Sequence, residues 1–487
     1  MSRQAVRVGQ MTDAALPELS YRADGGCGRF VEARVEGGAE MAERAGGGGG
    51  RVTRRQLLVG AGGAAVGGLV LGGVGGYVVG NAGGDDEGTA PVGGGDGDGS
   101  VDTIKLGSAS PTSGPYSGDG QEMVRGQELA VADINANGGV LGRQLELVVV
   151  DVEDPFAPER MVNSARRLTN EGVAAVFSGY TTTTSAEFDV YAEYGAPMFH
   201  LNTFQPNADY VADNGIDNIY HSCPTEVWYG PGFIQFMQRL IDGGLWTPSS
   251  ESAAVITSND PYSISIAQTV EDDLRGLGWD IPVSEEVTAP LTEWGPVLAQ
   301  IRQNPPGLIF HSDYIPGDLA SFQQQFRSDP TPSLMYQQYG PSIPEYLELA
   351  GTDADGVIWS TVIGTLPDEI GTAFKDAYRE EYGAEAGLSQ AGGQYDLVHL
   401  WAQAAGLAGD PTDFDAVNAN IKRLTYRGVS GTYRFKPGEL TAIPYPDEAS
   451  DPSLGMPHLT FQIQNQEQVL IDPFPYEQGE FQLPAWL

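Results

Sequence analysis

The sequence predicts an α/β fold with two doubly wound units, each a parallel sheet covered by helices. Apolar runs of strand length, such as LELVVVD at 145–151, alternate with amphipathic segments of helical period. Near-continuous apolar strands separated by helices are typical of parallel sheets buried on both faces. The alternation occurs twice, and 487 residues exceed what a single hydrophobic core usually holds. We therefore expect two lobes.

The first unit starts near residue 103 and has the order βαβαβ. Met123, Gly126, Ala130 and Ile134 recur at helical spacing, which gives one helix a face that can pack on a sheet. The expected strands are 104–107, 145–151, 173–178 and 197–201, and the expected helices are 121–137, 159–170 and 185–194.

The second unit starts after Tyr220 and shows the same alternation. Its strand-length apolar runs are again separated by segments of helical period, which favours a second parallel sheet. The expected helices are 230–240, 263–277, 294–303 and 319–326, and the expected strands are 253–257, 308–311 and 333–336.

A targeting segment precedes these units at 51–82. Arg54 and Arg55 stand before an uncharged, Gly-rich apolar stretch, and TRRQLL at 53–58 resembles the twin-arginine export signal. The stretch 56–79 is also long enough to span about 30 Å of hydrocarbon. Cleavage of the signal and its retention as a membrane anchor therefore both stay open, and either outcome places the folded part outside the cytoplasm.

The segments on either side of this signal are unlike the rest of the chain. Residues 1–50 are a leader of doubtful translation, with Met41 as the expected start. Residues 83–102 are rich in Gly and Asp, which predicts a flexible linker extended by charge repulsion.

Composition excludes several classes of function. The formal charge is −39 and the pI is about 4.2, which argues against nucleic acid as a partner because phosphate binding needs basic clusters. Carboxylates spread over a chain that is 41% hydrophobic indicate a folded, halophilic protein with the acidic surface of haloarchaeal-like proteins. Cys27 and Cys223 alone can form neither a disulfide framework nor a zinc site, and no cofactor is expected.

Several motifs resemble a known family. SGP at 113–115, ADINANGG at 132–139 and LGR at 141–143 precede a strand that ends on Asp151, and GYTTTTSAEF, GGQYDLVHLWAQA and GTYRFKPG follow. In this order they are similar to the type I periplasmic binding proteins of the branched-chain amino acid and urea/amide transport group. The resemblance implies a solute-binding protein that serves the permease and ATPase subunits of an ABC importer.

The resemblance also implies two lobes joined by a hinge of three chain crossings. We expect the crossings near 224–228, 356–361 and 435–438. The first lobe would then hold 103–225 and 357–435, and the second lobe would hold 226–356 and 436–487 together with the C-terminal tail.

A hydroxyl-rich loop is the leading candidate for ligand binding. Tyr180, Thr181, Thr182 and Thr183 follow a predicted strand and run into a helix, where hydroxyls and free N–H groups suit a carboxylate. One hydroxyl would suffice to cap the helix. The resemblance places a carboxylate-binding Ser or Thr in this loop, and we prefer Thr182 and Thr183.

Other candidates lie where ligands bind in open parallel sheets, in the loops after the strands. In the first lobe they are Tyr116, Asp119, Asn202, Thr203 and Phe204. In the second lobe Tyr262, Asp313 and Tyr314 could close over a ligand and accept its N–H groups. Where the family commonly holds an ammonium with an acidic residue, this chain has Gln338 and Tyr339, so Asp313 or Glu226 would supply the charge or the ligand is neutral.

No catalytic constellation is evident in the sequence: the G-x-S-x-G, Walker and H-E-x-x-H patterns are missing from the exported part. His200 and His311 end predicted strands and keep a general-base role open. The leading hypothesis is therefore an exported, non-catalytic binding protein for an amino acid, amide or urea. A ligand sensor for a receptor or regulator is the alternative, and an extracellular amidohydrolase is the third hypothesis.

Overall fold

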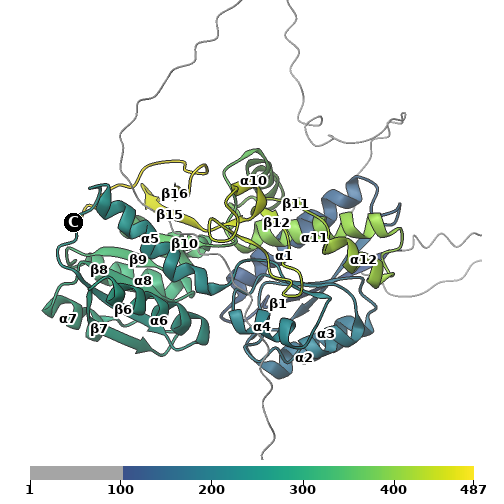
Figure 1. Ribbon diagram of the computed structural model, residues 1–487, viewed down its shortest axis with the longest axis horizontal. Helices are drawn as coiled ribbons and strands as arrows, with labels where there is room; N and C mark the ends of the chain where they lie inside the picture. The colour runs from purple at the N-terminus through teal and green to yellow at the C-terminus, as the bar shows by residue number, and fades with distance from the viewer. Residues whose placement is uncertain (1–102) are drawn as a thin grey trace, which may run out of the picture. The chain divides into compact units, whose positions relative to one another are not determined.

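A computed structural model describes residues 103–487 (Figure 1). The predicted leader, the twin-arginine segment with Arg54 and Arg55, and the linker 83–102 lie outside the described residues. Within 103–487, no helix has the length and apolar character needed to cross a membrane.

The first sheet has five strands, all parallel, in the order β2-β1-β3-β4-β5. Figure 1 shows helices on both sides of this sheet, as a doubly wound unit requires. The strands are β1 (Ile104–Ser110), β2 (Leu145–Asp151), β3 (Val176–Ser178), β4 (Met198–His200) and β5 (Ile219–His221). The helices between them are α1 (Ser117–Ala136), α2 (Pro158–Asn170), α3 (Phe188–Tyr194) and α4 (Gln205–Asp213).

The second sheet has seven strands in the order β16-β15-β10-β9-β8-β6-β7. The strands from β6 to β10 are parallel, and β15 and β16 add an antiparallel edge. Its strands are β6 (Ser252–Ser258), β7 (Asp280–Val287), β8 (Leu308–Ser312), β9 (Leu334–Gln337), β10 (Ile358–Thr361), β15 (Leu459–Gln464) and β16 (Glu467–Asp472). Its helices are α5 (Tyr229–Asp242), α6 (Pro261–Gly276), α7 (Gly295–Gln303), α8 (Pro316–Arg327) and α9 (Pro344–Ala350). The predicted fold class is confirmed.

After β10 the chain returns to the first sheet and then leaves it again. It forms α10 (Glu369–Tyr382), α11 (Gln390–Ala408), α12 (Phe414–Ile421), β11 (Tyr426–Arg427) and β12 (Thr432–Tyr433). The short pair β13 (Pro444–Tyr445) and β14 (Met456–Pro457) then leads into β15. Helix α11 packs along α1 and reaches β3, so it belongs to the first lobe.

Two of the expected chain crossings lie later than predicted. Strand β10 pairs with β9 and β15, so 357–361 belongs to the second lobe and not to the first. Thr441 bridges His221 at the edge of the first sheet, so 436–442 stays with the first lobe. The lobe to which each of these two segments belongs is decided by the strand with which it pairs. A sequence motif near a crossing does not reveal that pairing. Strand β7 was also missed, because it alternates exposed and buried residues instead of forming an apolar run.

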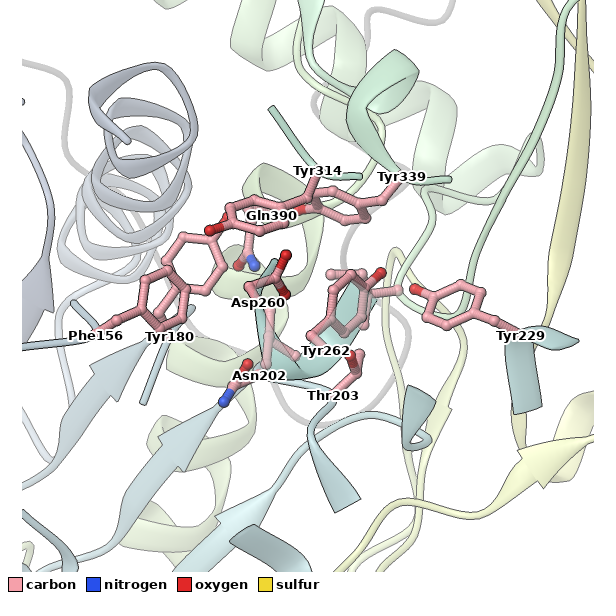
Figure 2. Close-up of a pocket in the computed structure, with 12 residues that line it drawn as sticks. Phe156, Tyr180, Asn202, Thr203, Tyr229, Asp260, Tyr262, Tyr314, Tyr339 and Gln390 are labelled. Carbon is pink, nitrogen blue, oxygen red and sulfur yellow. The ribbon is translucent and has the colours of Figure 1, made fainter. Parts of the chain in front are cut away.

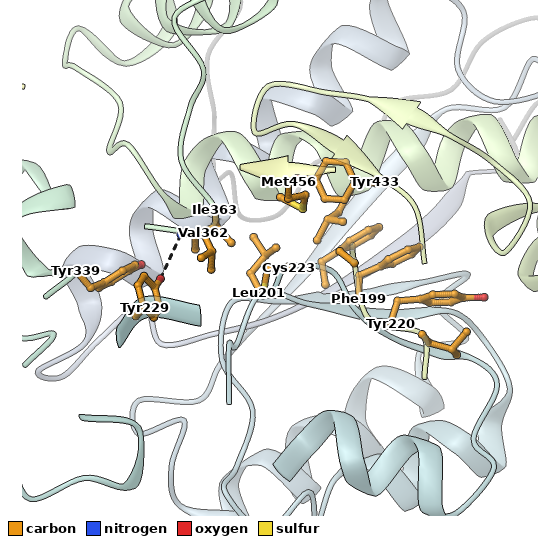
Figure 3. Close-up of a cluster of buried hydrophobic side chains, with 14 of the residues drawn as sticks. Phe199, Leu201, Tyr220, Cys223, Tyr229, Tyr339, Val362, Ile363, Tyr433 and Met456 are labelled. Carbon is orange, nitrogen blue, oxygen red and sulfur yellow. Dashed lines mark hydrogen bonds between the residues drawn. The ribbon is translucent and has the colours of Figure 1, made fainter. Parts of the chain in front are cut away.

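One buried cluster passes from the first sheet through the crossing segments to the second sheet. We call its part at the crossings the hinge cluster, and Figure 3 shows its side chains. Its members come from strand β4, from the segments after β5 and β10, and from β12 and β14: Phe199, Leu201, Cys223, Val362, Ile363, Tyr433 and Met456. The Val362 backbone N–H also donates to the Tyr229 hydroxyl, 3.3 Å away, as the dashed line in Figure 3 marks.

The contact between α1 and α11 is close enough to require glycine at one position. A Cβ added to Gly126 would lie 2.1 Å from the Ala391 carbonyl oxygen, which is shorter than the contacts that real Cβ atoms make. The two helices therefore approach at Gly126 more closely than alanine would allow.

The first prediction concerns this helix contact. Gly126→Ala should lower the free energy of unfolding by about 1–3 kcal/mol, because the methyl group forces α1 and α11 apart. Gly406→Ala is the matched control, since Gly406 lies in the same α11 with open space around it and should gain up to ~1 kcal/mol of helix stability. Urea denaturation of the three proteins measures both changes. Equal stability of Gly126→Ala and the unsubstituted protein would contradict the close contact.

Candidate functional site

A cavity lies where strand-end loops of the two sheets meet (Figure 2). Its empty volume is about 420 Å³, part of which is open to solvent. Its lining residues are Phe156, Tyr180, Leu201, Asn202, Thr203, Tyr229, Asp260, Tyr262, Tyr314, Tyr339, Ile363 and Gln390.

The position of the cavity follows from the parallel sheets. Tyr180 comes shortly after β3 and Asn202 shortly after β4, whereas Tyr262, Tyr314 and Tyr339 follow β6, β8 and β9. Because parallel strands end at the same edge of a sheet, the loops that follow them lie side by side at that edge. The cavity is thus built from the carboxyl ends of strands of both lobes.

Aromatic rings form a continuous wall around this space. Phe156 contacts Tyr180 and Tyr314, with ring centroids 5.6 and 6.0 Å apart. Tyr314 packs edge-on against Tyr262 at 6.2 Å, and Tyr262 packs edge-on against Tyr229 at 6.2 Å. Rings from the first lobe therefore touch rings from the second lobe, and the geometry is that of favourable aromatic pairs.

Asp119 fixes two of these rings from behind. Its Oδ2 accepts hydrogen bonds from the hydroxyls of Tyr180 and Tyr339, the latter at 3.0 Å. Asp119 is buried in α1, and burial raises its pKa to about 6 although the two tyrosine bonds oppose the rise. One carboxylate thereby links a loop of the first lobe to a loop of the second.

Of the hydroxyl-rich loop, Tyr180 lines the cavity and the three threonines do not. Thr182 is buried, and its N–H and hydroxyl donate to the carboxylate of Glu187 at 2.8 and 2.6 Å. Thr181 is buried in hydrogen bonds with Asn202 and Asn207, and Thr183 is exposed outside the cavity. The carboxylate that the loop was expected to attract is supplied by the protein itself.

The helix after this loop also starts later than expected. Helix α3 begins at Phe188 and not at residue 185, with Glu187 at its N-cap. The Glu187 carboxylate makes no capping hydrogen bond to α3 and turns back to accept from the Thr182 N–H and hydroxyl, the donors that an external anion would need.

Three more predicted residues lie beside the cavity without lining it. Tyr116 stacks on Tyr314 with ring centroids 6.2 Å apart. Gln338 is buried and donates to the Tyr262 hydroxyl at 3.0 Å. The Asp313 Oδ1 accepts from the N–H groups of Tyr314 and Ile315, and Asp313 is not among the lining residues.

Phe204 and Glu226 line a separate, more open hollow with Pro261 and Ser265. The two carboxylate oxygens of Glu226 accept from the Gln205 N–H at 2.6 Å and the Ser265 hydroxyl at 3.3 Å. Burial raises the pKa of Glu226 to about 7. Glu226 therefore lies between the two lobes, outside the cavity that the aromatic rings enclose.

Sequence reasoning missed six lining residues: Phe156, Leu201, Tyr229, Asp260, Ile363 and Gln390. Phe156, Asp260 and Ile363 follow the ends of β2, β6 and β10, so the strand-end rule could have found them. Gln390 begins α11, far along the chain, and only the packing of α11 on α1 brings it to the cavity.

The strand-end histidines do not reach the cavity. His200 and His311 have no exposed surface, and burial lowers both pKa values to about 3, so both are neutral. Residues 103–487 contain no group of three or more His, Cys, Asp or Glu side chains arranged to hold a metal ion.

Comparisons with known proteins place this architecture among binding proteins. Residues 103–442 match the family model described as periplasmic binding protein. A crystal structure from Silicibacter pomeroyi, assigned to a branched-chain amino acid ABC transporter, is 36% identical, with a TM-score of 0.73 covering 79% of this chain and 100% of that chain. The Leu/Ile/Val-binding protein homolog 7 of Brucella abortus (strain 2308) is 26% identical over 289 residues, 58% of this chain and 71% of its own.

A more distant structure shows likeness in fold alone. The substrate-binding protein LivJ of Streptococcus pneumoniae, solved in complex with isoleucine, is 21% identical, with a TM-score of 0.62 covering 76% of this chain and 100% of that chain.

The second prediction concerns stability against pH. Burial raises the pKa values of Asp119, Glu226 and Asp313 to about 6, 7 and 8, whereas unfolded carboxyls titrate near ~4. Between these limits the folded protein binds more protons than the unfolded chain, so these groups make the free energy of unfolding fall as pH rises from 5 to 8.

Asp313→Asn should flatten this dependence most between pH 7 and 8, because Asp313 titrates last of the three. Asp213→Asn, at an exposed position on α4, should leave the slope unchanged. Urea denaturation at fixed high salt and four pH values provides the measurement. A slope that is the same in Asp313→Asn and in the unsubstituted protein would contradict the burial of an ionisable Asp313.

Proposed function

The chain belongs to the periplasmic binding protein family, and from this premise we propose that it is the extracytoplasmic substrate-binding protein of an ABC importer. It captures a small amino acid, amide or urea-like solute between its two lobes and delivers it to permease and ATPase subunits. The protein acts on the outer face of the cytoplasmic membrane or outside the cell. It has no catalytic role in this proposal.

The observation that carries the proposal is the shared wall of the cavity. Tyr180 and Phe156 of the first lobe meet Tyr314 of the second lobe around one space, so a bound solute would contact both lobes at once. A ligand with such contacts favours the closed arrangement over an open one, which is how two-lobed binding proteins respond to solutes.

Two amide oxygens support a ligand that carries N–H groups. Asn202 is 9% exposed and directs its Nδ2 to Thr181 and Asn207, which leaves Oδ1 without a partner among the described residues. Gln390 Oε1 is likewise buried without a partner. Because unpaired buried acceptors are costly, a solute with donors would restore their hydrogen bonds. Amino acids, amides and urea all have such donors.

A sensor that reports the closed form to a receptor is the second candidate, since it would use the same cavity. The lobe-to-lobe bond between Tyr339 and Asp119 suits either role because it depends on the closed arrangement and not on the partner that recognises it. Release of product from amides or urea would instead support the amidohydrolase hypothesis.

The third prediction tests capture between the lobes. A thermal-shift screen of amino acids, short amides and urea in high salt should find a solute that raises the melting temperature, because binding to the folded state stabilises it. The same solute should reduce the radius of gyration in solution scattering. A saturating solute that leaves the scattering profile unchanged would contradict capture by closure.

Tyr314→Ala should raise the Kd for that solute about tenfold or more, the loss typical of a central aromatic contact. Phe474→Ala removes a ring that is 75% exposed and is not among the lining residues, and it should leave the Kd unchanged. Isothermal titration calorimetry of both variants measures the difference.

A further inference from the structure

The aromatic cavity has a negative electrostatic character. None of its lining residues is Lys, Arg or His, and Asp260 places a carboxylate in the wall. Asp119 lies directly behind Tyr180 and Tyr339, and Asp313 directly precedes Tyr314. Burial and, to a smaller extent, the charge of Asp260 raise the pKa of Asp313 to about 8, so Asp313 is mostly neutral at pH 7 and the negative charge of the wall lies on Asp260.

The Asp260 carboxylate is held in place by the fold. Its Oδ1 accepts from the Ser263 N–H at 2.9 Å as the N-cap of α6, and its Oδ2 accepts from the Ser258 hydroxyl at 2.7 Å. Each oxygen retains a further lone pair. In the view of Figure 2 the carboxylate points into the space framed by the rings of Tyr180, Tyr262 and Tyr314.

The ring wall suits a positive charge. Tyrosine and phenylalanine faces attract cations, and an aromatic cage is a recurrent way to bind an ammonium group. The hydroxyls of Tyr180 and Tyr339 donate to Asp119, and the hydroxyl oxygen of Tyr262 accepts from Gln338 Nε2. These polar ends are thus already bonded to the protein, which leaves ring surface as the main contribution of the tyrosines to the cavity.

The cavity offers little to an anionic group. The donors of Thr182, the best candidates for a ligand carboxylate, are closed by Glu187. The Asn202 amide nitrogen is turned away from the space, and its Oδ1 is an acceptor, as Figure 2 shows. Thr203 and Gln390 in the lining carry a hydroxyl and an amide donor, but a free carboxylate in the same space would be repelled by the charge of Asp260.

We propose that the ligand is a protonated organic amine without a carboxylate, held with its ammonium N–H groups on Asp260 and Asn202 Oδ1 and its carbon skeleton against the rings of Phe156, Tyr180 and Tyr314. The inference rests on the proposed capture between the two lobes, and it names a substrate class other than the amino acids, amides and urea considered there. Asn202 Oδ1 has no partner among the described residues, and such an acceptor favours a ligand with N–H donors over a quaternary ammonium ion, which has none.

A matched series of four compounds separates charge from shape. 3-Methylbutylamine, 4-methylpentanoate, 4-methylpentanamide and leucine share one branched skeleton and differ in whether they carry ammonium, carboxylate, amide or both charges. Calorimetric titration of the full chain in high salt at pH 7 should give the lowest Kd for 3-methylbutylamine. Its trimethylammonium analogue should bind at least about tenfold more weakly, because it has no N–H for Asn202 and Asp260.

Asp260→Asn tests the charge at constant shape. Asparagine keeps the N-cap of α6, so the fold should persist, while the Kd for 3-methylbutylamine should rise about tenfold or more through loss of the partly buried charge partner. Asp413→Asn is the control, because Asp413 is an exposed N-cap on α12 and the same change there should leave the Kd unaltered.

The outcomes distinguish this inference from the capture function. If leucine or 4-methylpentanoate binds more tightly than the amine, or if the amine does not bind, the amine inference is overturned. Binding of leucine, the carboxylate or the amide with compaction in scattering would still uphold capture. If the amine binds but Asp260→Asn binds it equally well, charge recognition at Asp260 is wrong.

Discussion

The arrangement of the site depends on contact between aromatic side chains of the two lobes. Phe156 and Tyr180 come from the first sheet, Tyr314 and Tyr339 come from the second, and Asp119 bonds to one hydroxyl from each. Parallel strands deliver these side chains to one edge of each sheet, and the hinge cluster joins the two sheets behind them. Removing this contact would leave two separate sheet edges and no enclosed space.

Electrostatics then decides what the enclosed space can hold. Burial raises the pKa values of Asp119 and Asp313, and among the described residues neither has a Lys or Arg side chain beside it. The low polarity of their surroundings also strengthens the electrostatic interaction with a charged group of a ligand. The acidic surface that the composition implies is solvated and screened, whereas Asp260 is partly buried among rings. Net charge and local charge therefore have the same sign here but different physical roles.

The fold followed closely from the sequence, and the site followed in part. Strand-end position and residue type selected Tyr180, Asn202, Thr203, Tyr262, Tyr314 and Tyr339, all of which line the cavity, and their contact with a ligand stays a prediction. They failed for Thr182, because no local pattern indicates that Glu187, five residues later, folds back onto its donors. They failed for Gln390 because its place depends on packing between α1 and α11, which are far apart in the chain. Local pattern determines elements, while long-range packing determines which side chains meet.

The bond between Glu187 and Thr182 has an evolutionary consequence. The resemblance to the family implies that this loop ordinarily receives the carboxylate of a solute, and here an internal side chain takes that part. A single substitution at such a residue exposes or conceals a ready-made anion receptor while the sheets stay the same. Proteins with this fold can thus change the class of solute that they bind through one substitution, while the fold stays the same.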